Sequence, residues 1–450
     1  MRCTWSYGRI CRPDHIGECK GEGWKNRIRS EKLDEKVENK QMKKKCLSLI
    51  LGIMLVLSLG SCGKEPVTTS GSAEQEMVKD DTTSSTPKAK REDSASKLAE
   101  NDSNEGNHAE VKIVMIGDIL LHEPVMAAFL QEDGSYDFSA LFDDTRELSQ
   151  NSDLAILNQE TILGGSELGV SGYPAFNSPQ EVGDAEVDAG YNTILSATNH
   201  ALDRGEGAIR KDISYWKEKH PDVTLLGLHE DEADAEKIRV VEKNGIRIAI
   251  LNYTYGTNGI AEPEDYLVDD LTEEKAMREL DRAEENADFT IVCPHWGTEY
   301  QLEESEYQRK YAKLFTEHGA DLILGAHPHV IQPIEWVESE NGNRCLCYYS
   351  VGNFVTGTSD SGAGIMNRVI SGMAEVTLHK DEDQVCIEHA DIHPLVCHWE
   401  NGSYRVIPLE HYSEELAEKN EIKYRDPSFS LDSVKLTVDS VWPNQEFKGE

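Results

Sequence analysis

Residues 110–118 read Glu-Val-Lys-Ile-Val-Met-Ile-Gly-Asp, and this stretch decides the fold class of the chain. It is short, nearly all apolar, and ends in a Gly-Asp pair. Similar apolar runs recur at 154–157, 193–195, 246–251, 289–292 and 322–324. Short continuous apolar runs are typical of strands in a sheet that is covered on both faces. The sequence therefore predicts a set of buried strands, of which residues 110–118 form the first.

Helix-like segments separate several of these runs, at 205–220, 273–285 and 304–318. The third ends before Gly319, a residue that suits the end of a helix. Strands that alternate with helices indicate an α/β architecture, in which functional sites gather where strands end and loops begin. From 345 to 408 the pattern changes to strand-like pieces without intervening helices. We expect these pieces to form a second, more antiparallel sheet.

The chain has 450 residues, enough for two or three average domains, but its first hundred residues have no globular pattern. We expect one large folded domain over residues 109–412. The remainder, 413–450, is predicted to be a polar C-terminal extension.

An export signal is predicted at residues 42–62. Met42 is followed by three lysines and a short apolar run that ends in Leu-Gly-Ser-Cys at 59–62. The run is shorter than the about 20 apolar residues that a membrane-spanning helix needs. Its end resembles the lipobox of bacterial lipoproteins, which implies cleavage before Cys62 and lipidation of that cysteine. Residues 1–41 show no hydrophobic period, and we expect them to be an over-extended start with Met42 as the true initiator.

Residues 63–108 are rich in Ser, Thr, Lys, Glu, Asp and Asn and have almost no large apolar side chains. Such a segment cannot bury enough apolar surface to offset the entropy lost on folding. We therefore expect a disordered linker that holds the folded domain away from the lipid surface. Together with the lipidated cysteine, it predicts an extracytoplasmic protein that is lipid-anchored to the bacterial cell membrane.

The formal net charge is -38 and the sequence pI is about 4.7. This charge argues against nucleic acid or anionic lipid as a partner through bulk attraction. Any anion that the protein handles needs local cations. Five of the ten cysteines lie at or before Cys62, and the other five have no framework spacing, so we expect no disulfide scaffold. Cys345 and Cys347 alternate as buried strand residues would, rather than as a zinc site.

Polar residues follow the predicted strands at the points where these end. They are Asp118, Asn158, Glu160, Asn199, His200, His295, His327 and His329. Each alone is weak evidence, because a Gly-Asp pair is more often a turn and a lone histidine is more often hydrogen-bonded locally. Together they would converge on one rim. Carboxylate, imidazole and carboxamide ligands suit a divalent transition metal, with Mn, Zn and Fe all plausible.

Six segments resemble, in order, those of CapA-type poly-γ-glutamate capsule biosynthesis proteins, the PGA_cap domain of the calcineurin-like metallophosphoesterase superfamily. They are 117–122, 158–160, 197–205, 294–300, 325–332 and 349–354. The resemblance implies an α/β fold, specifically a metallophosphatase-like four-layer α/β/β/α sandwich with two mixed sheets. It also implies a site for one or two ions.

The resemblance further implies a ligand set. Asp118 and His329 would hold one ion, Asn199, His295 and His327 the other, and Glu160 would bridge them where the superfamily usually has Asp. His200 would donate a proton to the leaving group. Asp203 would orient His200, although a carboxylate at this position could equally cap the following helix.

One position departs from the superfamily pattern. A second ligand, His, normally lies two residues after the first Asp, but here Leu120 holds that place and His122 lies two residues further on. His122 could substitute as a ligand or contact substrate, or the site could hold a single ion. The cleft beside the metal is expected to include Asn158, Trp296, Glu299, Tyr300, Gln332 and Asn353. For the two aromatic residues, packing in the core is an equally good reading.

These features predict a surface-anchored protein of capsule or poly-γ-glutamate biosynthesis or export. It would act as a metal-dependent hydrolase of phosphoester or amide bonds, on an anionic polymer or phosphoester substrate, with a capsule synthesis membrane complex as partner. The alternative is a non-catalytic accessory lipoprotein that binds polymer. A third possibility is another function in the cell envelope, such as nucleotide scavenging or peptidoglycan amide hydrolysis. The Asn199-His200 pair favours an enzyme, because a pure binder needs no proton donor.

Overall fold

The structure, a computed structural model, describes residues 109–443 and 446–448 except 360 and 383. The predicted start 1–41, signal 42–62 and linker 63–108 lie outside the described residues. Within the described part, no helix is both long and apolar enough to cross a membrane.

The first of two sheets has nine strands in the order β14-β13-β12-β1-β2-β3-β4, with β11 paired to β1 and β15 to β13. Strands β1 to β4 run parallel, whereas β12 to β14 are antiparallel, so the sheet is mixed. Its strands are β1 (Ala109–Leu120), β2 (Leu154–Asn158), β3 (Thr193–Leu195), β4 (Thr224–Leu226), β11 (Asn353–Thr356), β12 (Ile370–Asp381), β13 (Gln384–Glu400), β14 (Ser403–Pro408) and β15 (Glu446–Lys448).

The second sheet has six strands in the order β5-β6-β7-β8-β10-β9. Its four inner strands are parallel, and each edge strand is antiparallel to its neighbour. The strands are β5 (Arg239–Lys243), β6 (Ile246–Thr254), β7 (Phe289–His295), β8 (Leu322–Leu324), β9 (Ile334–Glu338) and β10 (Arg344–Tyr348). All the apolar runs predicted as strands before residue 325 are strands in the structure, which confirms the α/β class.

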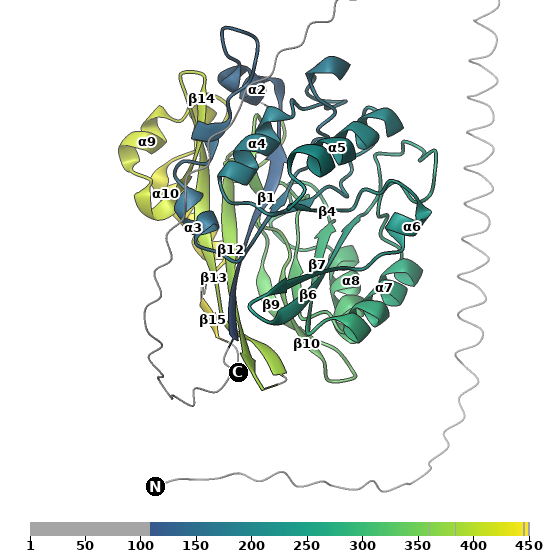
Figure 1. The fold of residues 1–450 in the computed structure, drawn as a ribbon. Helices are drawn as coiled ribbons and strands as arrows, with labels where there is room; N and C mark the ends of the chain where they lie inside the picture. The colour runs from purple at the N-terminus through teal and green to yellow at the C-terminus, as the bar shows by residue number, and fades with distance from the viewer. Residues whose placement is uncertain (1–108, 360, 383, 444–445, 449–450) are drawn as a thin grey trace, which may run out of the picture. The chain divides into compact units, whose positions relative to one another are not determined.

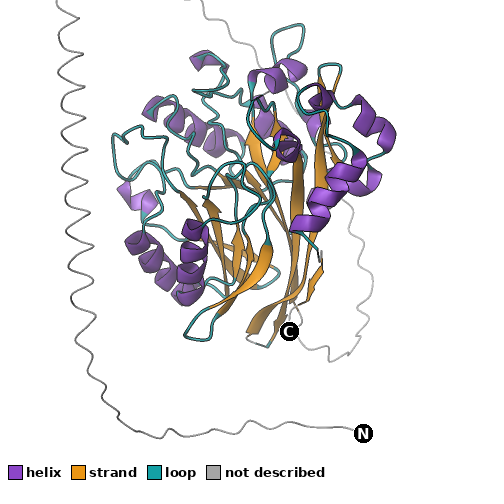
Figure 2. Ribbon diagram, turned by 180° about the vertical axis from the view of Figure 1, so that it is seen from behind, coloured by secondary structure: helices purple, strands orange, loops and turns teal. Residues whose placement is uncertain are grey.

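Helices cover the outer sides of the two sheets (Figures 1 and 2). The α-helices are α2 (Glu123–Phe129), α3 (Arg146–Gln150), α4 (Glu181–Asp188), α5 (Glu206–Lys219), α6 (Glu232–Ala235), α7 (Glu273–Asn286), α8 (Glu306–Glu317), α9 (Glu414–Lys419) and α10 (Leu431–Val441). Short 3-10 helices are η1 (Ser139–Leu141), η2 (Ser166–Leu168), η3 (Ile365–Val369), η4 (Leu409–His411) and η5 (Glu421–Tyr424). The expected two mixed sheets between helical layers are thus present.

Alternation along β6 shows how the sheets are layered. Ile248 and Ile250 belong to the large core shared by the two sheets, whereas Ala249 and Leu251 belong to a separate core with α7 and α8. Successive side chains of a strand point to opposite faces, so a strand buried on both faces must be apolar throughout. This is the physical reason for the continuous apolar runs in the sequence.

The prediction that residues 345–408 form a second, more antiparallel sheet of their own is wrong. Strand β10 instead joins the second sheet, parallel to β8. Strand β12 pairs antiparallel with β1, from Ala109 opposite Lys380 to Ile116 opposite Met373, and so extends the first sheet. The alternating pattern correctly indicates strands, but it contains no information about which strand each one pairs with.

The C-terminal segment also differs from expectation. Instead of a loose polar extension, α10 begins at a capping box formed by Ser430 and buries Val434 and Val438. Trp442 is buried and its Nε1 donates a hydrogen bond to the carbonyl of Gln332 at 2.8 Å. Apolar residues four positions apart lie on one face of a helix, and this short pattern is easily missed among polar neighbours.

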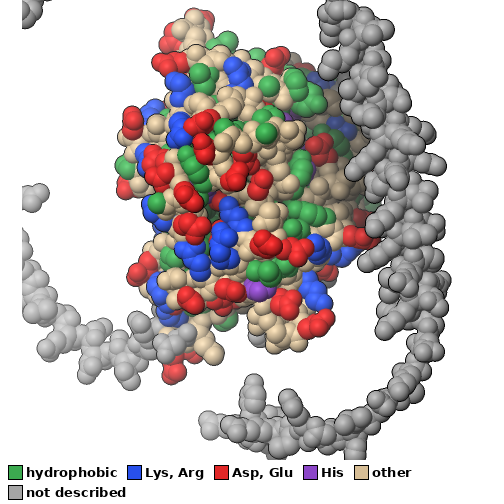
Figure 3. All heavy atoms as spheres, turned by 90° about the vertical axis from the view of Figure 1, so that its right-hand side faces the viewer, with side chains coloured by type: hydrophobic (Ala, Val, Ile, Leu, Met, Phe, Trp, Pro, Cys, Tyr) green, Lys and Arg blue, Asp and Glu red, His purple; other side chains and the backbone are tan. Residues whose placement is uncertain are grey.

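The surface mixes both signs of charge despite the large negative total. Figure 3 shows acidic and basic side chains interspersed over one face. Many are paired, as in Arg247 with Asp288 at 2.5 Å and Arg405 with Asp144 at 2.7 Å. Exposed pairs of this kind contribute little to stability, so the packed core between the layers holds the fold together.

A buried carboxyl group in α5 makes the stability of the folded protein depend on pH. Asp212 is fully buried and accepts a hydrogen bond from the Leu163 amide at 2.9 Å, and burial raises its pKa to about 7. Between its ordinary pKa and 7 the folded protein keeps a proton that the unfolded chain releases, so stability falls as pH rises through this window.

We therefore expect a lower unfolding temperature at pH 8 than at pH 5. Asp212→Asn should lessen the decline, by about 2 to 4 kcal/mol in unfolding free energy at the higher pH. Thermal unfolding of both proteins across this range measures the difference. An equal decline in wild type and variant would show that Asp212 titrates normally.

Candidate metal centre

The polar residues predicted at strand ends do meet, and they come from both sheets. Asp118 lies near the end of β1, and Glu160 follows β2. His295 is the last residue of β7 in the second sheet, and His327 and His329 follow β8. The carboxyl ends of parallel strands in both sheets therefore open onto a common site, as is usual for α/β folds.

Two groups of buried side chains have the spacing of a metal site. The ligand atoms of Glu160, His295 and His327 lie within 4.8 Å of one another, and those of Asp118, Glu160 and His329 do so as well. Glu160 belongs to both groups. Its Oε1 lies 3.6 Å from Nε2 of His295 and 3.6 Å from Nε2 of His329. A carboxylate shared by two ligand groups is positioned to bridge two ions, as the resemblance implies.

Three potential metal-binding atoms of this site have no hydrogen-bond partner among the described residues. Among the described residues, neither carboxylate oxygen of Glu160 nor Nδ1 of His327 has a hydrogen-bond partner, although both side chains are buried. Burial raises the pKa of Glu160 well above its ordinary value. Burying a carboxylate that accepts no hydrogen bond is costly, and a bound cation would reduce that cost. Carboxylate oxygens with imidazole nitrogens fit a divalent transition metal, so these residues suit the predicted cofactor.

The imidazoles differ in their surroundings. Burial, followed by the neighbouring histidines, lowers the pKa of His295 and His327 well below the ordinary value, so both are neutral, the form that binds metals. Burial acts in the same direction on His329, but the charge of Glu160 and the contact with Asp118 outweigh it and raise its pKa to about 10. His329 Nδ1 lies 3.0 Å from Asp118 Oδ2.

Two asparagines hold the ligands in place. Asn158 Nδ2 donates to Asp118 Oδ1 at 2.8 Å and lies 3.3 Å from His295 Nδ1. Asn199 Oδ1 lies 2.9 Å from His295 Nε2, the position expected of a second ligand to the same ion. Asn158 was predicted to line the cleft; instead it is 1% exposed and lies behind the ligands. Residues that orient metal ligands in this way tune affinity.

The backbone at the site is strained. His327 has φ 96° and His329 has φ 59°, a region that non-glycine residues rarely adopt. Such strain persists only where the surroundings enforce it, and it concentrates at functional sites. In β1, a Cβ at Gly117 would lie 1.8 Å from the carbonyl oxygen of Gly352. Glycine is therefore required before Asp118, which explains the Gly-Asp pair.

His200 and Asp203 form a buried pair beside the ligands. Nδ1 of His200 lies 2.7 Å from Asp203 Oδ2, and the same oxygen accepts a hydrogen bond from the Phe176 amide at 2.8 Å. The side chain of Asp203 is 2% exposed. Helix α5 begins after Gly205, so Asp203 does not cap it. Of the two predicted roles, the structure thus supports orientation of His200.

His122 does not replace the ligand missing at Leu120. Neither ligand group found among the described residues includes it. Its Nδ1 accepts a hydrogen bond from the Gly357 amide at 3.2 Å, and burial lowers its pKa to about 4. Together with His329, it lines a cavity of about 650 Å³. Of the two roles predicted for His122, ligand or substrate contact, its place in the cavity wall is compatible with substrate contact.

Only some of the residues predicted to line a cleft are found in the wall of this cavity. Glu299, Tyr300 and Asn353 line it. Trp296 does not: it is fully buried, stacks on Phe315 and Tyr349, and donates from Nε1 to the Tyr349 carbonyl at 3.0 Å. An aromatic residue after a strand can pack in the core or line a cleft, and Trp296 packs in the core.

Gln332 is likewise not a cleft residue. Its Nε2 donates to the carbonyls of Gln301 and Glu303 at 2.9 and 3.0 Å, and its Oε1 accepts from Gln308 at 2.6 Å. These bonds use both N–H groups and the oxygen of the amide, so Gln332 connects the neighbouring loop to α8 instead of facing the cleft.

Two residues of the site were not predicted. Arg368, in η3, lines the cavity and is 2% exposed. Asn258 accepts a hydrogen bond from Asn199 Nδ2 at 3.2 Å. Neither belongs to a recognisable motif, since each is a single polar residue in a loop or short helix. Only their spatial position reveals them.

Two mixed sheets between helical layers bring Asp, Glu, Asn and His side chains together at their strand ends, an arrangement that suits an α/β protein with a metal site. The chain belongs to the family described as bacterial capsule synthesis protein PGA_cap, whose model matches residues 112–358. This confirms the resemblance seen in the sequence.

Two curated relatives carry capsule-related names. The chain is 32% identical over 170 residues to the PGA biosynthesis protein CapA of Bacillus subtilis (strain 168), covering 37% of this chain and 43% of that protein. It is 31% identical over 196 residues to the capsule biosynthesis protein CapA of Bacillus anthracis, covering 41% and 46%. Each match thus spans less than half the length of the relative.

Solved structures are more distant. A hypothetical protein from Thermus thermophilus has 17% identity and a TM-score of 0.38, covering 63% of this chain and 97% of that chain. The calcineurin-like phosphoesterase YfkN from Bacillus subtilis has 14% identity and a TM-score of 0.34, covering 73% and 99%. At these TM-scores the solved structures give no information about the site, and its residues are assigned from their own geometry.

Proposed function

We propose that the protein is a metal-dependent hydrolase of phosphoester or amide bonds that acts in capsule or poly-γ-glutamate biosynthesis or export. The observation that carries this proposal is Glu160, a buried carboxylate without a described hydrogen-bond partner that belongs to two ligand groups at once. Such a carboxylate is poorly explained by stability and well explained by cation binding.

The residues divide into ligands and a proton donor. Asp118 and His329 would hold one ion, and Asn199, His295 and His327 the other, with Glu160 between them. When bound, the divalent metal, Mn, Zn or Fe, would neutralise negative charge that develops on the substrate as water attacks. His200, whose Nδ1 faces Asp203, would present Nε2 to the leaving group and donate its proton there.

The family and the cavity both support the proposed substrate class. The relatives are named for capsule and PGA biosynthesis, and we propose a related anionic polymer or phosphoester as substrate here. The cavity of about 650 Å³ beside His329 could hold several atoms on either side of the bond to be cleaved.

A non-catalytic accessory that binds polymer is the second candidate. It is favoured by one observation: Leu120 occupies the position where the superfamily places a histidine ligand, and His122 does not supply one. Fewer ligands around the first ion would suit binding better than catalysis.

Turnover separates the two candidates. Purified protein supplied with Mn or Zn is assayed on p-nitrophenyl phosphoesters and on a γ-linked glutamate polymer, beside His295→Ala. The enzyme proposal expects metal-dependent turnover that His295→Ala abolishes. Polymer binding without turnover in the metal-loaded wild type would establish the accessory role instead.

The proposed location is the outer face of the bacterial cell membrane. A lipidated Cys62 would anchor the protein there, and the segment up to residue 108 would connect the anchor to the folded domain, next to a capsule synthesis membrane complex. The proposal is supported by the lipobox-like residues 59–62. Mass spectrometry of the mature protein tests it: an N-terminus at a diacylated Cys62 is expected, and an unmodified N-terminus upstream of it would refute the anchor.

A further inference from the structure

The loop after β6 lies beside the predicted ligands of one of the two ions. This β6 loop, residues 255–270, is closed at its base by backbone hydrogen bonds. The amide of Thr254, the last residue of β6, donates to the carbonyl of Asp269 at 2.9 Å, and the amide of Leu271 donates to the carbonyl of Thr254 at 2.7 Å. Surface loops of this length with closed ends are Ω-loops, which are frequently functional.

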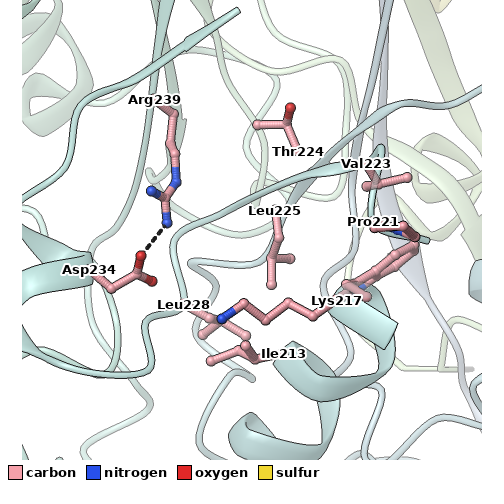
Figure 4. A pocket seen from close by; sticks show the side chains of 10 residues that line it. Ile213, Lys217, Pro221, Val223, Thr224, Leu225, Leu228, Asp234 and Arg239 are labelled. Atoms are coloured by element: carbon pink, nitrogen blue, oxygen red, sulfur yellow. Dashed lines mark hydrogen bonds and ion pairs between the residues drawn. The ribbon is translucent and has the colours of Figure 1, made fainter. Parts of the chain in front are cut away.

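Charged side chains anchor the base of the β6 loop. Oδ2 of Asp269 lies 2.8 Å from Nε2 of His229, and Lys275 in α7 also pairs with Asp269. Nδ1 of His229 lies 3.7 Å from Oδ2 of Asp234, and the other oxygen of Asp234 pairs with Arg239 at 2.8 Å (Figure 4). Charge-assisted contacts of this kind connect the base of the loop to α6, α7 and β5, and they fix where the loop begins and ends.

Asn258 in the β6 loop contacts the metal centre with its side chain. Its Oδ1 accepts a hydrogen bond from Nδ2 of Asn199 at 3.2 Å, and its Nδ2 lies 3.5 Å from Nδ1 of His200. Asn199 and His200 are 2% and 7% exposed, whereas Asn258 is exposed. One exposed amide therefore touches both a predicted ligand and the predicted proton donor.

Tyr255, three residues earlier, contacts the same group of ligands. Its amide donates to the carbonyl of His295 at 3.0 Å, and its ring centroid lies 4.6 Å from that of His327. Burial raises the pKa of Tyr255 to about 12, and a hydrogen bond with Asn199 acts against that rise. Through Tyr255 and Asn258 the β6 loop thus contacts all three predicted ligands of one ion.

The orientation of the Asn199 carboxamide decides whether it can bind a cation. Its oxygen is an acceptor and can be a ligand, whereas its nitrogen carries two N–H groups and cannot. The two ends of the carboxamide have nearly the same shape, so hydrogen bonds must select between them. Oδ1 lies 2.9 Å from Nε2 of His295, and Nδ2 donates to Asn258. Asn258 thus supplies the acceptor that keeps the oxygen of Asn199 directed toward the other predicted ligands.

We propose that Asn258 is a positioning residue of the metal centre, which holds the oxygen of Asn199 in place to bind its ion. This inference rests on the proposed metal-dependent function. Groups that orient metal ligands in this way change metal affinity by about 10- to 100-fold. Asp118 and His329, the predicted ligands of the other ion, take no part in these contacts, so the effect should fall on one of the two ions.

The backbone at Asn258 allows clean variants. Asn258 has φ 54°, a conformation that glycine adopts freely, so Asn258→Gly removes the amide without straining the loop. Asn258→Asp also tolerates this conformation and keeps an acceptor for Nδ2 of Asn199. Asn244, in the turn before β6, is a matched control: it is exposed, has φ 49°, and its Nδ2 donates to the carbonyl of Glu110 at 2.8 Å. Asn244→Gly therefore removes an equivalent amide at the opposite end of the same strand.

Metal affinity tests this inference without relying on turnover. The full-length proteins are stripped of metal and titrated with Mn or Zn against a competing chelator of known affinity. Asn258→Gly should bind one ion per chain about 10- to 100-fold more weakly than wild type. Asn258→Asp should recover most of that affinity, and Asn244→Gly should bind both ions as wild type does. Thermal unfolding of the metal-free Asn258→Gly should match that of metal-free wild type.

Four results would overturn the inference. They are equal affinity of Asn258→Gly and wild type for both ions, an equal loss in Asn258→Asp, an equal loss in Asn244→Gly, and a wild type that binds neither metal. The expected pattern of affinities in a protein that shows no turnover would refute only the enzyme proposal.

Discussion

Glu160→Gln is expected to make the metal-free protein more stable and to abolish its stabilisation by metal. Glu160 is fully buried, and in the described part of the chain its carboxylate has no hydrogen-bond partner. Replacing the carboxylate by an amide removes a desolvation cost of about 1 to 3 kcal/mol. Without the shared ligand, however, the ions lose the donor that both groups have in common.

The wild type should be less stable than Glu160→Gln without metal and should be stabilised when metal is added. A ligand that binds only the folded state stabilises it by about 2.7 kcal/mol when present at a hundred times its dissociation constant. Thermal unfolding with chelator and with added Mn or Zn measures both effects. A Glu160→Gln protein that metal stabilises as much as wild type would show that this carboxylate is not a ligand.

Glu186 in α4 offers a matched control. It too is fully buried with both oxygens lacking a described partner, and burial raises its pKa well above the ordinary value. It belongs to neither ligand group. Glu186→Gln should therefore stabilise the metal-free protein in the same way and leave the response to metal intact. The contrast between the two variants separates the cost of burial from metal binding.

His200→Ala is expected to lower turnover by about 10²- to 10⁴-fold while metal content stays unchanged. Its imidazole would protonate the leaving group, and it belongs to neither ligand group of the described residues. Asp203→Asn should cause a smaller loss, because the asparagine can keep the 2.7 Å contact but cannot stabilise a charged imidazole as well. Steady-state kinetics with metal analysis measure both.

The control for this prediction is His220, which pairs with Asp184 at 2.8 Å and belongs to neither ligand group of the described residues. His220→Ala should leave turnover unchanged. Full turnover in His200→Ala would remove the proton donor from the account and favour a role in binding. Loss of metal in the same variant would instead make His200 a ligand.

The sequence was sufficient to predict that the candidate ligands lie together, because each follows an apolar run. Strand ends can be read locally, and strands that point the same way bring their ends together, so Asp118, Glu160 and His295 could be predicted to converge. Which sheet each strand joins could not be predicted. Partners such as β12 for β1 are chosen by contacts between residues more than two hundred positions apart.

Residues around the ligands were harder to place for the same reason. Trp296 and Tyr300 are both aromatic and only four positions apart, yet one lies in the core and the other in the cavity. Arg368 belongs to no motif in the sequence, and only the structure shows that it is buried in the cavity wall. Composition and spacing do not reveal burial at a single position.

The metal content of the purified protein tests the central claim most directly. Plasma mass spectrometry of wild type, His295→Ala and His329→Ala would give the number of ions per chain. We predict two ions in the wild type and one in each variant, because His295 and His329 belong to different groups that share only Glu160. Wild type without metal, or variants with the same content as wild type, would contradict the account.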